Sequence, residues 1–186
     1  RKNELNQIDY SVIRGELLAI RAYVHFDLLR LFGYGNYAQR NSELNSKLTL
    51  PYATTRSKNL PSQVTGSVFY TSLIKDIEEA ISLLKDNDPV SNTDMTRFSE
   101  VNKEGFYKFR DIHLNYYAVK ALEARVHMWF GGSAAVDKAL EAALEVISLV
   151  EKGGFTNPSL QTEMKLLELS EISDKNSSLT PEALFA

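Results

Sequence analysis

The sequence predicts an all-α protein, and three observations predict it. Small and apolar residues recur at steps of three and four in four separate segments, which is the spacing of one face of an α-helix. Glycine, proline and asparagine gather between these segments, and such residues end helices and form loops. No stretch of useful length alternates polar and apolar residues as a half-buried strand does.

The first segment, residues 5–33, predicts one long helix that ends at a glycine-rich turn. About 30 helical residues make a rod of roughly 45 Å. The middle of its apolar stripe is small, with Gly15, Ala19 and Ala22. Glycine inside a helix costs about 1 kcal/mol relative to alanine. The place of Gly15 on the buried stripe therefore predicts a groove where a second helix packs closely.

Three more helices follow. The second is predicted to begin at residues 61–63 and to end at Leu84, and the third to be capped by Asp111 and to end at Gly131. The fourth is closed by Gly153 and Gly154. The predicted inner faces are Leu114, Ala118, Ala121 and Met128 in the third helix, and Val136, Ala139, Ala143, Val146 and Val150 in the fourth.

Two long loops are predicted, over about residues 34–61 and 87–110, because neither stretch keeps a helical period. The first loop includes a short extended piece at residues 48–50. Residues 163–170 could form one more short helix. A loop as long as 34–61 is uncommon inside a domain, and such loops are often functional.

The third and fourth helices are predicted to form a tight antiparallel pair. Their spacing hints at a tetratricopeptide unit, with Ala139, Ala143 and Val146 at steps of four and three, and Ala124 seven residues before Gly131. The tryptophan, leucine and proline positions of that repeat are not filled. We expect residues 1–186 to be one helical domain and, because the chain begins with arginine, a piece of a longer protein.

Composition excludes several classes of function. Twenty-one basic and 24 acidic residues give a net charge of -3, without the basic excess that nucleic acid binding requires. The longest apolar runs are four residues, and a membrane-spanning helix needs roughly 20. No cysteine is present, which excludes disulfides, thiolate metal sites and iron–sulfur clusters.

No enzymatic, cofactor or metal site is predicted. Of the three histidines, His113 and His127 are expected on one helix about 21 Å apart, too far to share a metal, and His25 has no partner at ligand spacing. The sequence contains neither a phosphate-binding glycine motif nor a Gly-x-Ser-x-Gly elbow.

Arg21 and Arg125 are predicted to form structural ion pairs, because each lies among small apolar residues on a helix. An arginine at a helix contact keeps its charge and needs a carboxylate or carbonyl partner. Glu16, Asp76 and Glu123 are the candidate partners. Ligand binding by the two arginines is the alternative.

The first loop contains the candidate ligand-binding residues Tyr34, Asn36, Tyr37 and Tyr52. Aromatic rings stack on the apolar faces of sugars, and amides hydrogen bond to hydroxyl groups. The loop is therefore a candidate site for a glycan or a peptide. Packing of the rings on the helices is the alternative.

Four ordered blocks, and a short match near the end of the sequence, resemble the SusD/RagB-type proteins. Residues 15–33, GELLAIRAYVHFDLLRLFG, resemble the family's G-E-A-x-x-x-R-A-Y-x-x-F-x-L-x-x-x-Y-G helix. Leu50-Pro51-Tyr52 resembles its Leu-Pro step, and residues 68–84, VFYTSLIKDIEEAISLL, resemble its V-Y-x-x-I-x-x-D-L-x-x-A-x-x-L-L helix. Residues 115–126, NYYAVKALEARV, are similar to its A-x-x-A-L-x-A-R-V segment, and residues 182–185 to its E-x-I-F.

The resemblance implies a non-enzymatic surface lipoprotein of the outer membrane of Bacteroidetes-like bacteria. Such a protein covers a SusC-like TonB-dependent transporter and captures glycans, oligosaccharides or peptides. The implied fold is a right-handed superhelix of tetratricopeptide-like helix pairs. The family's lipid-bearing cysteine and irregular C-terminal half have no counterpart, so the likeness is to the helical N-terminal part. The chain itself is therefore expected to be soluble.

A tetratricopeptide-like scaffold for protein–protein interaction, without a sugar-binding role, is the alternative function. A precursor with a lipid-attachment signal would favour the nutrient-binding protein. A cytosolic precursor with further helical repeats would favour the scaffold.

Overall fold

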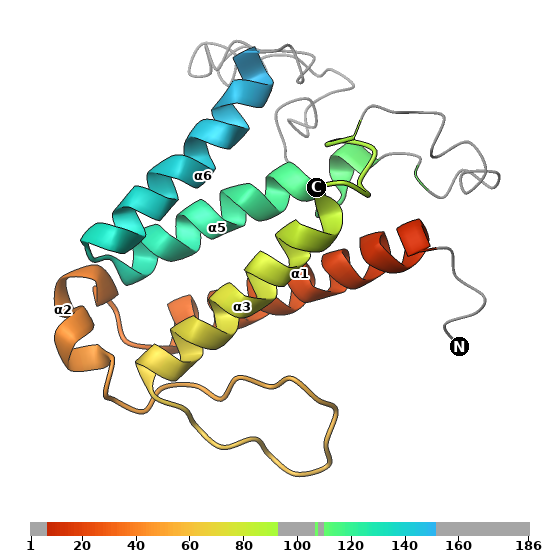
Figure 1. Cartoon of the computed structure of the whole chain (residues 1–186). Helices are drawn as coiled ribbons and strands as arrows, with labels where there is room; N and C mark the ends of the chain where they lie inside the picture. Colours follow the sequence, from red (N-terminus) through yellow and green to blue (C-terminus); the bar gives the residue numbers. More distant parts are fainter. Residues whose placement is uncertain (1–6, 93–106, 108–109, 152–186) are drawn as a thin grey trace, which may run out of the picture.

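The computed structural model describes residues 7–92, 107 and 110–151, and within them the regular structure is helical (Figure 1). The helices are α1 (Gln7–Phe32), α2 (Tyr37–Leu44), α3 (Gly66–Leu84), α5 (Tyr116–Phe130) and α6 (Ser133–Glu151), with a 3-10 helix, η1 (Arg110–Ile112), before α5. The predicted all-α class is confirmed.

The helices pack as antiparallel pairs, α1 with α3 and α5 with α6, and α3 joins the two pairs by packing on α5 (Figure 1). Gly15, in the first half of α1, lies against Leu84 at the end of α3. Tyr116, at the start of α5, hydrogen bonds to Glu145 in the second half of α6. This arrangement is consistent with stacked helical repeats, and the right-handed superhelix remains a prediction.

Helices α1 and α3 approach each other closely at Gly15. A Cβ atom added there would lie 2.8 Å from Cγ of Leu84 and 3.3 Å from the carbonyl oxygen of Ala80. Ala19 and Ala22, further along the same face, are fully buried. The predicted groove of small residues is therefore confirmed, and α3 is the helix that fills it.

The core lies where α1, α3 and α5 meet. An edge-to-face contact joins Phe26 of α1 to Trp129 of α5, with ring centroids 6.1 Å apart. The largest fully buried apolar side chains are Phe26, Phe69, Leu29, Leu44, Leu73, Ile77, Leu84, Val12, Val119 and Val126. Every long helix except α6 contributes to this set, so α6 rests on the outside of α5.

Helix α2 corrects the first predicted loop, because residues 37–44 are helical. The ring of Tyr37 is buried against Phe130 at the end of α5, with centroids 4.6 Å apart. Gly131 has a φ of 68°, and a Cβ there would lie 2.7 Å from Cα of Ala38. Contact with the end of α5 thus fixes a short helix whose own polar sequence gives little signal.

Helix α3 begins at Gly66 and not at residues 61–63. Leu48 and Thr65 form an isolated antiparallel β-bridge, and the backbone N–H of Thr49 donates to the carbonyl of Val64 at 2.8 Å. The extended piece predicted at residues 48–50 is thereby confirmed. Because this pairing uses residues 64–65, the helix can begin only after them.

Helix α5 begins at Tyr116 and is capped by Asn115, whose Oδ1 accepts the backbone N–H of Ala118 at 3.0 Å. Asp111 lies in η1, so its predicted capping role is wrong. His113 precedes α5, and the expectation that it shares one helix with His127 is also wrong.

The predicted inner faces are partly right. Ala118 and Ala139 are buried, whereas Met128 of α5 and Val136 of α6 are 57% and 44% exposed. Buried Ala142 adjoins the predicted Ala143. Most of the predicted loop 87–110, the glycine stop at 153–154 and the short helix at 163–170 lie outside the described residues.

His127 is a buried titratable group between α5 and α3. Its Nδ1 is 2.8 Å from the hydroxyl of Tyr70, and its Nε2 lies 4.0 Å from Glu123 and has no hydrogen-bond partner among the described residues. Burial lowers the pKa of His127, and the nearby carboxylate of Glu123 opposes this shift only in part. The folded protein therefore favours the neutral imidazole.

We predict that replacing Gly15 by valine lowers the free energy of unfolding by about 1–3 kcal/mol, since the new side chain must displace Leu84. Thermal unfolding followed by circular dichroism measures the change. Gly35→Ala is the matched control, because a Cβ at Gly35 meets no atom within 4 Å. Equal melting temperatures for the two variants would contradict the close contact.

We also predict that the protein loses stability as the pH falls below about 6.5, the ordinary pKa of histidine. Since the pKa of His127 is lowered in the folded state, the unfolded chain binds more protons in this range. Urea unfolding at several pH values should show a smaller acid loss for His127→Gln than for the parent. The same loss in both proteins would exclude His127 as its source.

Candidate functional site

The candidate site is the loop between α2 and α3, which extends beyond the helical layer (Figure 1). Residues 52–57 and 59–62 of this loop line a concave pocket of about 550 Å³, within the size range of small-molecule sites. Its polar side chains include Thr54, Thr55, Arg56, Ser57, Asn59 and Ser62. The pocket thus offers hydroxyl and amide groups and one cation, with the ring of Tyr52 at its edge.

Asp76 of α3 anchors this loop. Its carboxylate accepts hydrogen bonds from Nε and NH2 of Arg21, both at 2.6 Å, and from the hydroxyl of Tyr52 at 2.6 Å. The side chain of Asp76 is 6% exposed and that of Arg21 is 30% exposed. NH1 of Arg21 also donates to the carbonyl of Thr54 at 3.3 Å. Arg21 therefore forms the structural ion pair predicted for it.

The electrostatics of this cluster keep Arg21 and Tyr52 in their donor forms. The hydrogen bond to Asp76 raises the pKa of Arg21 above its ordinary value. Burial raises the pKa of Tyr52 far above its ordinary value, and the Asp76 carboxylate adds to the shift. Tyr52 consequently remains a neutral donor to Asp76 across the physiological pH range.

The ring of Tyr52 is also held in place. It stacks on His25 of α1 with centroids 4.1 Å apart, and it meets Phe69 edge to face at 5.2 Å. The sequence patterns did not identify His25 as part of this site, because no partner residue lies at the spacing of a metal or catalytic ligand. One signal was available: His25 lies one helical turn after Arg21, which places the two side chains on neighbouring parts of one helix face.

The other three predicted loop residues lie around the start of α2. Tyr34 and Asn36 are exposed, and Nζ of Lys47 is 5.7 Å from the centroid of the Tyr34 ring. Tyr37 is only 3% exposed, and its hydroxyl donates to Asn45 at 2.8 Å. Its ring has no free face for a ligand, so the binding role predicted for Tyr37 is wrong. Tyr52 belongs to the separate cluster around Asp76.

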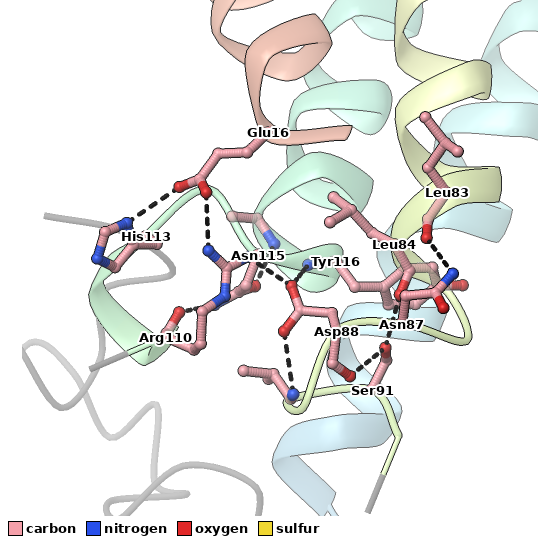
Figure 2. A network of polar contacts seen from close by, with 12 residues as sticks. Glu16, Leu83, Leu84, Asn87, Asp88, Ser91, Arg110, His113, Asn115 and Tyr116 are labelled. Carbon is pink, nitrogen blue, oxygen red and sulfur yellow. Dashed lines mark hydrogen bonds and ion pairs between the residues drawn. The ribbon is translucent and has the colours of Figure 1, made fainter. Parts of the chain in front are cut away.

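A second polar cluster joins α1 to the segments before α5 (Figure 2). The buried guanidinium of Arg110 bonds to Asp88 at 2.7 Å and to Glu16 at 2.8 Å, and Glu16 also contacts His113 at 3.0 Å. Asp88 further accepts the backbone N–H of Tyr116 at 3.2 Å. Burial opposes the charge of Arg110, yet the two carboxylates raise its pKa.

This second cluster has a structural role, because it links α1 to the segments before α5. Glu16 forms a structural ion pair as predicted, but its arginine partner is Arg110, which the sequence patterns did not single out. Its charges satisfy one another almost completely, and among the buried side-chain atoms of this cluster only Nε of Arg110 is without a hydrogen-bond partner in the described residues. The arrangement leaves few groups free for a ligand.

Arg125 differs from the prediction. Its side chain is exposed, and its guanidinium carbon lies 5.9 Å from the centroid of the Phe26 ring. Within residues 7–92, 107 and 110–151 it forms no ion pair, because Glu123 pairs with Lys120 at 2.7 Å. The ion pair predicted for Arg125 is therefore replaced by a cation–π contact.

Among the described residues, no three histidine or acidic side chains are grouped as metal ligands would be. In the same part of the chain, no helix is both long and apolar enough to cross a membrane. Comparison with known protein families finds no match for this chain, and comparison with curated proteins finds none either.

We predict that Asp76→Asn lowers the free energy of unfolding by about 2–3 kcal/mol, since the new amide turns a donor toward Arg21 and leaves a largely buried cation unpaired. Urea unfolding measures the change. The control is Glu79→Gln in the exposed Arg14–Glu79 pair, which should cost much less because water and salt screen an exposed ion pair. Similar costs for both variants would argue against the anchor.

Proposed function

We propose that this chain is the helical part of a SusD-like protein that binds glycans or oligosaccharides at the bacterial outer membrane and supports their uptake. The observation that carries the proposal is that residues from separate sequence blocks contact one another. Arg21 comes from the block at 15–33, Tyr52 from the Leu-Pro step and Asp76 from the block at 68–84, and all three share one hydrogen-bonded cluster.

The fourth block adds to this support. Arg125, in the block at 115–126, lies over the ring of Phe26 in the first block. Chance likeness of unconnected helices gives no reason for the matching arginine and aspartate to contact each other, or for the residue after the Leu-Pro step to join them. Their contacts favour a shared architecture, in which the matching residues hold the helices and the loop together.

The chemistry of the loop pocket favours a neutral, hydroxyl-rich ligand. Threonine, serine and asparagine side chains line it, and these groups both donate and accept hydrogen bonds as sugar hydroxyls do. Exposed Tyr34 and Asn36, before α2, offer a second polar and aromatic surface. No chemical step on the ligand is proposed, and no cofactor is involved.

An apolar stripe on α1 supports docking to another protein. It consists of Leu17, Ile20, Val24, Leu28 and Leu31, which are 41–74% exposed. Their spacing of three and four residues places them on one helix face. In the proposed function the protein partner is a SusC-like TonB-dependent transporter, and the attachment to the membrane is through a lipid.

The second candidate function is a tetratricopeptide-like scaffold that binds proteins and not sugars. It is favoured by a second exposed stripe on α6, formed by Val136, Leu140, Leu144 and Ile147. Because α1 and α6 each expose an apolar stripe, the protein offers more apolar surface to protein partners than a sugar site needs.

Binding to a panel of neutral oligosaccharides and to unstructured peptides, measured by titration calorimetry, separates the two candidates. We predict sugar binding that weakens roughly tenfold or more in the double variant Thr55→Ala/Asn59→Ala, because two pocket hydrogen bonds are lost. Ser82→Ala, at an exposed position of α3, should bind as the parent does. Tyr34→Ala tests the surface before α2.

Peptide binding without sugar binding would favour the scaffold. Sugar binding that the pocket variant leaves unchanged would place the ligand elsewhere and contradict the loop pocket as its site.

A further inference from the structure

His25 of α1 makes two contacts that together fix its protonation. Its Nδ1 lies 2.8 Å from the carbonyl oxygen of Arg21, and its Nε2 lies 3.0 Å from the backbone nitrogen of Ala53. A carbonyl oxygen only accepts and a backbone N–H only donates. Both bonds therefore form at once only when Nδ1 carries the single proton of a neutral imidazole and Nε2 is the acceptor.

The second of these bonds reaches the candidate site. Ala53 lines the loop pocket and directly follows Tyr52, whose ring stacks on the same imidazole. The bond to Ala53 thus joins the backbone of the pocket wall to α1. The side chain of His25 is therefore titratable, lies outside the pocket lining, and holds Ala53 of that lining in place.

We propose that His25 is a positioning residue of the loop pocket, which holds Ala53 in place when neutral and releases it when protonated. The consequence for ligand capture rests on the proposed function, whereas the hold on the loop does not. The pocket would then be well formed at neutral pH and looser in acid.

Protonation of His25 removes the acceptor, since Nε2–H would then face the N–H of Ala53, donor against donor. The charged or titratable groups around the imidazole are Arg21 on α1, Asp76 on α3 and Tyr52 on the loop. Arg21 adds a like charge, and the Asp76 carboxylate already accepts from Arg21 and Tyr52. The Tyr52–Asp76 bond does not need His25, so the loop loosens at Ala53 and stays anchored at Tyr52.

Hydrogen exchange of the loop, measured on the whole chain by mass spectrometry, tests the proposal. Protection of residues 53–62 is compared between about pH 8 and about pH 5, after correction for intrinsic exchange and with α6, which contains no histidine, as internal reference. We expect acid to lower the protection roughly three- to tenfold, as the loss of one hydrogen bond implies.

Two substitutions separate positioning from a general loss of structure. His25→Gln keeps an acceptor oxygen but cannot be protonated in this range, so the loop should stay protected at both pH values. His25→Phe keeps an aromatic ring for Tyr52 but has no acceptor, so protection should be low at both. His113→Gln, on exposed His113, is the control and should keep the response of the parent.

Equal protection in His25→Phe and in the parent at pH 8, or an unchanged acid response in His25→Gln, would overturn the proposal. Oligosaccharide titrations on the same proteins form the second arm. We expect the affinity to fall in acid for the parent and not for His25→Gln. If no oligosaccharide binds while the loop still responds to pH, the proposed function fails and the positioning role of His25 stands.

Discussion

The carboxylate of Asp76 is the point on which the arrangement of α1, α3 and the long loop depends. One largely buried anion accepts from a helix-borne cation, Arg21, and from a loop hydroxyl, Tyr52. A buried charge is tolerated only when its partners compensate the loss of water. Asp76 therefore needs both Arg21 and Tyr52 as partners. These two contacts together determine how α1 is rotated against α3 and where the loop runs.

Helical periodicity predicts the four long helices because apolar residues recur at steps of three and four along each of them. The small stripe around Gly15 also predicts a close helix contact, which Leu84 and Ala80 complete. Helix boundaries are less accessible from sequence. The start of α3 depends on a β-bridge between Leu48 and Thr65, and no local pattern announces a pairing between residues 17 positions apart.

The candidate site is predictable only in part, because it too depends on contacts between residues that are distant in the sequence. Tyr52 belongs to the predicted set and lies at the edge of the pocket, but Tyr37 is buried, because α2 forms only through contact with α5. The role of His25 depends on the backbone of Ala53, 28 residues away. Every residue except proline has the same backbone N–H group. A hydrogen bond to such a group therefore cannot be recognised from composition or from the spacing of side chains.

Any partner that covers the exposed stripes on α1 and α6 would couple folding to association. Full burial of a leucine or isoleucine side chain contributes about 1.5–3 kcal/mol, and these side chains, Leu17 and Leu140 among them, remain about half exposed. A partner that covers them binds the folded chain and not the unfolded one, so its concentration enters the folding equilibrium by mass action. The melting temperature of this chain is then a property of its surroundings as well as of its sequence.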